Sequence, residues 1–150
     1  MNELFTIEDD VLVKYLGKDK IIVIPEGVKA IGFEAFYNNK TAEEIIMPNS
    51  LRYIYPKSFS CIGSQLKTIV IPKNVELIDS RAFDCSNIEK IYILSKGICI
   101  SVDAFDHCYE LTDIYFAGNE KDWEDAFMRC DDEQLFGEQN FKIHFNYVNK

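Results

Sequence analysis

Two stretches of the chain repeat nearly the same pattern of apolar and polar positions. The first, IVIPEGVKAIGFEAF, runs from Ile22 to Phe36, and the second, IVIPKNVELIDSRAF, runs from Ile69 to Phe83. Each begins with isoleucines at alternate positions, which predicts a short strand that turns one face toward a core. The proline that follows has a fixed φ and no N–H, so it ends the strand and turns the chain.

The same unit recurs along most of the chain. The paired apolar positions of the predicted strands are Ile22/Ile24, Ile45/Met47, Ile69/Ile71, Ile91/Ile93, Ile114/Phe116 and Ile143/Phe145. A second inward-facing segment is predicted around Ile31, Ile54, Ile78, Ile100 and Trp123. Corners follow at intervals of 22 to 24 residues, at Ala35-Phe36, Ser58-Phe59, Ala82-Phe83, Ala104-Phe105 and Ala126-Phe127. Such a fixed period is typical of a solenoid, in which each coil covers the apolar face of its neighbour.

Both ends of a solenoid need a cap, because each exposes a cross-section of the core. Residues 1–20 alternate about an Asp9-Asp10 turn and predict a β-hairpin. Near the other end, Asn119 is a candidate N-cap for an amphipathic helix that carries Trp123 and Phe127, and a last strand follows it. We therefore expect a single domain over residues 1–150, with a hairpin cap (1–20), repeats (21–117) and a C-terminal repeat and cap (118–150). The expected fold class is a β-rich α+β repeat solenoid of about five coils.

Two segments resemble the BspA-type leucine-rich repeats, whose pattern is L-x-x-I-x-I-P, then V-x-x-I-G, then A-F-x-x-C-x-x-L. They are LKTIVIPKNVELIDSRAFDC, from Leu66 to Cys85, and AFDHCYELTDIYF, from Ala104 to Phe116. The resemblance covers about residues 19–127. It departs at Leu94, which stands where proline is expected, and at an insertion around Ile62 to Ser64. The resemblance implies a leucine-rich-repeat superhelix and, since members are commonly bacterial surface or adhesion proteins, a binding module.

Composition and charge exclude several classes of partner. The formal net charge is -9, and the sixteen basic residues form no stripe that could neutralise a run of phosphates, so we expect no nucleic acid. Apolar runs such as Ile21 to Ile24 are far shorter than the ~20 residues of a membrane-spanning helix, so no membrane insertion is expected. No secretory signal is recognisable at the N-terminus. We expect a cytoplasmic protein, or a cell-surface or secreted one if a signal peptide has been removed.

Cysteines recur at the corners, two or three residues after the phenylalanine: Cys61, Cys85, Cys108 and Cys130. We expect them to stack as a ladder of reduced, buried thiols, since free cysteine is among the most buried residue types. Tetrahedral zinc needs ligands that converge on one point, and a linear ladder spreads them out. The sequence therefore predicts no metal site and no cofactor.

The segment DAFDHC brings Asp103, Asp106, His107 and Cys108 together in sequence, which is a candidate for a cysteine nucleophile with its base. Adjacent side chains point in different directions in most backbones, and a nucleophile and its base usually come from separate elements. We therefore expect no catalytic residue and no enzymatic activity.

The middle residue of each first strand points outward if its neighbours point inward. These residues form the column Val23, Ile46, Val70, Tyr92, Tyr115 and His144, with a mixed-charge rim at Glu44, Thr68, Lys90, Asp113 and Lys142. An exposed apolar and aromatic stripe marks an interaction site, although β-branched residues and tyrosine also simply favour strands. We expect the stripe to bind a protein or, less favoured, a glycan. The alternative is a homodimer or structural component that buries the stripe against its own copy.

Overall fold

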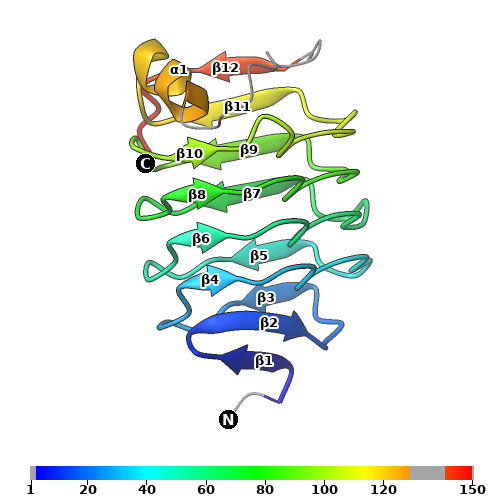
Figure 1. The fold of residues 1–150 in the computed structure, drawn as a ribbon. Coiled ribbons are helices and arrows are strands. Elements are labelled where there is room, and N and C mark those ends of the chain that lie inside the picture. Colours follow the sequence, from blue (N-terminus) through cyan, green and yellow to red (C-terminus); the bar gives the residue numbers. More distant parts are fainter. Residues whose placement is uncertain (1–2, 129–140, 150) are drawn as a thin grey trace.

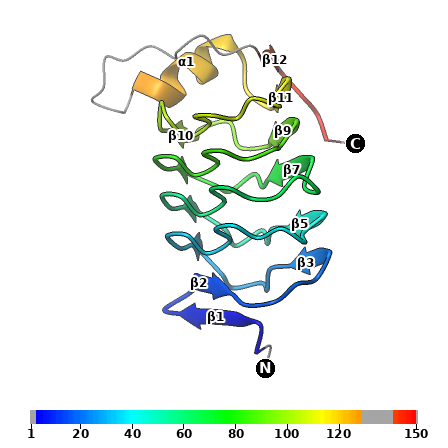
Figure 2. The same cartoon turned by 90° about the vertical axis from the view of Figure 1, so that its right-hand side faces the viewer.

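The computed structural model describes residues 3–128 and 141–149, and it shows a stack of coils with strands on two opposite sides (Figure 1, Figure 2). The first strand of each coil is β3 (Ile21–Val23), β5 (Glu44–Ile46), β7 (Thr68–Ile71), β9 (Lys90–Ile93) or β11 (Asp113–Phe116). The second is β4 (Ala30–Ile31), β6 (Tyr53–Ile54), β8 (Leu77–Ile78) or β10 (Cys99–Ile100). The expected β-solenoid of about five coils is confirmed.

Parallel pairing between successive coils aligns equivalent residues. In β7, β9 and β11, Ile69 pairs with Ile91 and Ile91 with Ile114, so isoleucine lies on isoleucine at this interior position. The second strands pair in the same way, with Ile54 on Ile78. These isoleucines are at most 2 % exposed, because the alternation of the sequence turns them all to one side.

A column of aromatic rings fills the corner of every coil. Phe36 stacks on Phe59 with ring centroids 5.1 Å apart, and Phe59 stacks on Phe83 at 5.2 Å. Phe83 continues the column to Phe105 at 5.8 Å. Alanines such as Ala35 are fully buried beside the rings, and their small side chains allow the coils to approach. The repeated Ala-Phe pair is therefore the part of each coil that fills the space between neighbours.

The N-terminal hairpin consists of β1 (Phe5–Glu8) and β2 (Val11–Tyr15), joined by Asp9 and Asp10, both with positive φ. β2 also pairs in parallel with β4, and the six-stranded sheet has the order β1-β2-β4-β6-β8-β10. Tyr15 packs against Phe36 at 5.6 Å and so extends the aromatic column. The hairpin therefore covers the first coil, as expected.

At the other end lie α1 (Glu120–Met128) and β12 (Lys142–His144). The side-chain oxygen of Asn119 accepts a hydrogen bond from the N–H of Asp122, and the Asp122 carboxylate accepts one from the N–H of Asn119. This reciprocal arrangement is a capping box. Trp123 is buried within α1, so the fifth copy of the repeat is a helix where earlier copies have a short strand and a turn.

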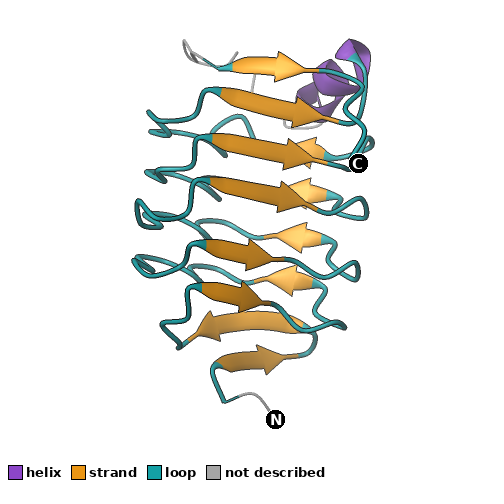
Figure 3. Cartoon of the chain, turned by 180° about the vertical axis from the view of Figure 1, so that it is seen from behind, coloured by secondary structure: helices purple, strands orange, loops and turns teal. Residues whose placement is uncertain are grey.

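The sheet of first strands is broken once. β3 and β5 form a two-stranded sheet, whereas β7, β9, β11 and β12 form a four-stranded one (Figure 3). The break follows the coil that carries the insertion, where Gly63 donates its N–H back to the carbonyl of Asn39. A Cβ at Gly63 would lie 2.8 Å from the Cα of Lys40, so this close contact needs glycine. The sequence predicted an altered loop here but not a divided sheet.

Candidate functional site

The six residues of the predicted stripe lie on the outer face of the first strands, in two runs. Val23 pairs with Ile46 in the two-stranded sheet. In the four-stranded sheet Val70 pairs with Tyr92, and the in-register pairs continue from Tyr92 to Tyr115 and from Tyr115 to His144. His144 lies in register with Tyr115 although 29 residues separate them in the chain.

The apolar part of this surface is open to solvent and the aromatic part is tightly stacked. Val23 is 58 % exposed, and Ile46 and Val70 are each 44 % exposed. The rings of Tyr92 and Tyr115 are stacked with centroids 4.7 Å apart, and Tyr115 stacks on His144 at 4.4 Å. Stacked rings are fixed in orientation, so they offer a flat, preorganised surface at a low cost in side-chain entropy.

Tyr147 adds a ring that the repeat pattern did not predict. Tyr147 follows β12. Its ring centroid lies 5.3 Å from that of Tyr92 and 5.5 Å from that of Tyr115, and its ring plane is tilted against both. The residue stands outside the apolar-x-apolar period, so no spacing in the sequence points to it. Only the course of the chain after β12 brings it across the stripe.

The rim carries charges of alternating sign. Lys90, Asp113 and Lys142 occupy one register position on neighbouring strands. A carboxylate oxygen of Asp113 lies 2.7 Å from Nε2 of His144. This hydrogen bond is the main reason that the pKa of Asp113 lies below its ordinary value. The contact also fixes the His144 ring on Tyr115, so the rim orients one member of the stripe.

A groove of 720 Å³ runs between β5 and β7, at the break in the sheet. Its lining includes Ile46, Met47, Thr68, Val70, Pro72 and Lys73. Ladder bonds to β9 use the residues on either side of Val70, which leaves the N–H and C=O of Val70 directed toward β5. No ladder hydrogen bond joins β5 to β7 in residues 3–128. The groove thus divides the stripe and exposes backbone donors and acceptors within it.

The cysteine ladder differs from the prediction of stacked, buried thiols, because Cys85 is exposed and Cys61 and Cys108 are only partly buried. Positive φ marks one column at the corners, and its members are Asn38, Cys61, Cys85 and His107. Cys108 belongs to the next column with Ser86, and its Sγ lies 3.4 Å from the Ser86 hydroxyl. In the fourth coil the cysteine follows the phenylalanine by three positions instead of two, so His107 takes the place in the column that cysteine has in the two coils before it. Cys130 lies outside the described residues.

The residues of the DAFDHC segment do not form a nucleophile and base. Nδ1 of His107 lies 2.8 Å from the carboxylate of Asp84, in the neighbouring coil. The thiol of Cys108 donates to the carbonyl of Phe83 over 3.0 Å, and burial raises the pKa of this thiol to about 11. A buried protonated thiol is unreactive. Asp103 accepts hydrogen bonds from Ser80 and Ser101 and so ties the corners of two coils together.

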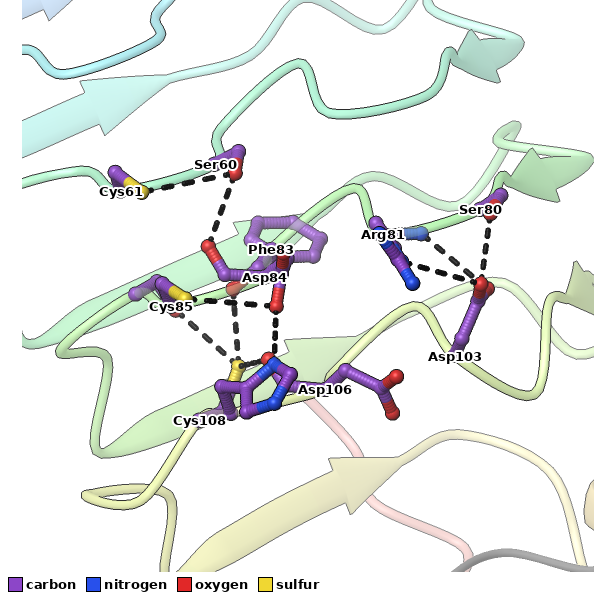
Figure 4. Close-up of polar contacts among 12 residues, drawn as sticks. Ser60, Cys61, Ser80, Arg81, Phe83, Asp84, Cys85, Asp103, Asp106 and Cys108 are labelled. Atoms are coloured by element: carbon purple, nitrogen blue, oxygen red, sulfur yellow. Dashed lines mark hydrogen bonds and ion pairs between the residues drawn. The ribbon is translucent and has the colours of Figure 1, made fainter.

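One cluster at the corners has the residue types of a metal site. The ligand atoms of Asp84, Cys85 and His107 all lie within 4.8 Å of one another. The Sγ of Cys85 lies 3.6 Å from the Asp84 oxygen that also contacts His107 (Figure 4). Burial is the main reason that the pKa of the Cys85 thiol is raised. The carboxylate of Asp106 points away from this cluster (Figure 4).

Comparison with protein families gives one match over most of the chain. The family described as BspA type Leucine rich repeat region matches residues 7–133 in six copies. No curated protein matches the chain at a significant level. In the described residues, no helix has both the length and the apolar character to cross a membrane.

Three solved structures share the fold. A leucine rich cell surface protein from Faecalibacterium prausnitzii A2-165 is 24 % identical with a TM-score of 0.56, over 83 % of this chain and 39 % of that one. A leucine-rich repeat protein of T. pallidum is 21 % identical with a TM-score of 0.55, over 75 % of this chain and 69 % of that one. A leucine-rich repeat protein from Bacteroides ovatus is 17 % identical with a TM-score of 0.52, over 84 % of this chain and 42 % of that one. The chain thus spans about two fifths of the length of the first.

Proposed function

Because the chain belongs to the BspA-type leucine-rich repeat family, we propose that it is a non-enzymatic module that binds a protein through the outward face of its first strands. The observation that carries the proposal is the continuous stack of Tyr92, Tyr115 and His144, with Tyr147 across it. Aromatic side chains are enriched among the residues that dominate binding energy at protein interfaces. Val70 extends this surface to the groove.

The surroundings of the stack favour a protein over a glycan. Val23, Ile46 and Val70 are exposed apolar side chains, and their burial against another apolar surface is favourable. The groove between β5 and β7 adds free backbone groups that accept polar contacts from a peptide. The alternating charges of Lys90, Asp113 and Lys142 would form a polar rim, as protein interfaces have. One of the solved structures is of a cell surface protein, so we place the proposed interaction at the cell surface.

Affinity capture from lysate and medium of the source cell tests the proposal. The wild type is compared with a Val70→Lys, Tyr92→Lys, Tyr115→Lys variant and with a control, Tyr53→Lys, Tyr55→Lys. The control changes two stacked tyrosines whose ring centroids are 6.1 Å apart. They lie in and directly after β6, in the sheet of second strands. We expect one protein to be enriched by the wild type and the control and lost with the triple variant. Equal capture by all three, with circular dichroism showing retained fold, would contradict the proposal.

Light scattering examines the self-association alternative with the same variants. If the stripe pairs with a second copy, the wild type is a dimer and the triple variant is a monomer. We expect the wild type to be monomeric at micromolar concentration. A dimer that dissociates only in the triple variant would replace the proposed partner by a second copy of this chain.

A further inference from the structure

We propose that Asp84, Cys85 and His107 form a binding site for a divalent transition-metal ion of the zinc class. The site lies at the corner where the coil that carries Asp84 and Cys85 (Figure 4) stacks on the coil that carries His107. It is separate from the strand face, so it holds or fails independently of the proposed partner binding.

The distance between the sulfur and oxygen donor atoms matches that of a tetrahedral site. Zinc bonds of about 2.3 Å to sulfur and 2.1 Å to oxygen, at the tetrahedral angle, place these two ligand atoms about 3.6 Å apart. The Sγ of Cys85 and the Oδ1 of Asp84 are 3.6 Å apart. Nitrogen and oxygen ligands of the same ion are about 3.4 Å apart, and Nδ1 of His107 lies 2.8 Å from Oδ1 of Asp84. To share an ion with Oδ1 of Asp84, Nδ1 of His107 must therefore move away from it by about 0.6 Å.

The backbone holds two of these residues in place before any ion binds. Cys85 and His107 occupy equivalent left-handed positions, with φ of 57° and 56°. The N–H of Cys85 donates to the carbonyl of Asp106 over 3.1 Å, which ties one ligand residue to the coil of the other. The side chain of Asp84 is only 15 % exposed, whereas that of His107 is 53 % exposed. The partly buried carboxylate thus forms the floor of the site, and the imidazole and thiol remain accessible to an incoming ion.

The set of ligands selects the class of metal. Thiolate and imidazole are ligands for zinc, cobalt and copper, whereas magnesium and calcium take oxygen ligands. Three protein ligands leave one position of a tetrahedral ion, which water occupies in many zinc sites. Cys61 is the neighbour of Cys85 in the same column, but its thiol is not among the donor atoms that lie within 4.8 Å of one another.

This inference replaces the expectation of no metal site. That expectation assumed that the corner ladder contained thiols alone, which would be spread along a line. Because the cysteine of the fourth coil stands one position later than in the coils before it, His107 takes the position beside Cys85, and Asp84 turns its carboxylate to it. Three donor types then converge from two coils.

Titration of the full chain with Co²⁺, in a phosphine reductant, tests the site. We expect binding of one ion with a thiolate-to-cobalt charge-transfer band in the near ultraviolet, and displacement of that ion by Zn²⁺ but not by Mg²⁺ or Ca²⁺. Cys85→Ser is expected to abolish the band. Asp84→Asn and His107→Gln are expected to weaken binding by at least about tenfold, since even outer-shell changes cost 10–100-fold.

Two variants are matched controls. Cys99→Ser removes a thiol from the second-strand sheet, and Asp106→Asn removes a carboxylate next to His107 in the chain. Both are expected to bind cobalt as the wild type does. Melting temperatures of all variants exclude loss of fold as the cause. Absence of the band in the wild type, or a band that survives Cys85→Ser, would overturn the proposal.

Discussion

The corner residue Ser58 is a buried serine at a position where the other described coils have alanine. It stands where other coils have Ala35, Ala82 and Ala104, and it is completely buried. Among the described residues, its Oγ is the one buried side-chain oxygen or nitrogen without a hydrogen-bond partner. A buried hydroxyl without a partner costs about 1–3 kcal/mol.

We therefore expect Ser58→Ala to raise the free energy of unfolding by about 1 kcal/mol, measured by urea denaturation. Ser60 is the control, since it is also buried but its hydroxyl donates to the carbonyl of Asp84 over 3.2 Å. Ser60→Ala should lower the free energy of unfolding. A loss of stability in Ser58→Ala would show that its hydroxyl has a partner.

The thiol of Cys108 makes stability depend on pH in the alkaline range. Burial raises its pKa to about 11 in the folded protein, from 9.0 for an ordinary thiol. The unfolded chain therefore loses this proton first as the pH rises, and the contribution to stability that is complete below pH 9 disappears as the pH passes about 11. A shift of this size corresponds to about 2–3 kcal/mol.

Cys108→Ser keeps a hydroxyl donor for the carbonyl of Phe83 but does not titrate in this range. We expect wild type to lose about 2–3 kcal/mol more than Cys108→Ser between pH 9 and 11 in denaturation experiments. Cys99→Ser should behave as the wild type does. Parallel pH curves for wild type and Cys108→Ser would contradict a buried, protonated thiol.

At the scale of elements, the break between β5 and β7 predicts a local difference in hydrogen exchange. The amide of Val70 is directed toward β5, where no ladder bond is present in residues 3–128, whereas the amide of Ile71 lies in the ladder with β9. An amide without a hydrogen bond exchanges with solvent without any opening of the structure. We expect the Val70 amide to exchange at least about tenfold faster than that of Ile71 by NMR. Equal protection of the two amides would show that the sheet is continuous.

The sequence predicted the elements that recur with the repeat of 22 to 24 residues. Isoleucines at alternate positions and the recurring Ala-Phe pair indicated the strands, the corners and the solenoid, and the capping pattern at Asn119 and Asp122 indicated the helix. Features set by contacts between coils were not predictable. The groove lies next to the coil in which Gly63 packs on Lys40 of the preceding coil. The Asp84, Cys85 and His107 cluster arises because histidine stands at the corner position that cysteine has in the two coils before it, which an alignment by residue type conceals.

At the scale of the whole molecule, two sides of the solenoid differ in what they offer a partner. The first-strand side carries the aromatic stack and the groove. The second-strand side carries strands of only two residues, with Tyr53 and Tyr55 as a smaller stacked pair. The placement of the six stripe residues follows directly from the alternation of the strands, but the role of that surface is a proposal. The division into residues 1–20, 21–117 and 118–150 likewise stays a prediction.

Hydrogen exchange of the full chain, with and without the protein that it captures, tests the proposed binding face most directly. We predict that the partner slows exchange in β7, β9 and β11 and at the groove, since a bound surface excludes water from those amides. The exchange of β6, β8 and β10 should stay unchanged. Protection confined to β6, β8 and β10 or to α1, with β7, β9 and β11 unaffected, would contradict a binding site on the first-strand face.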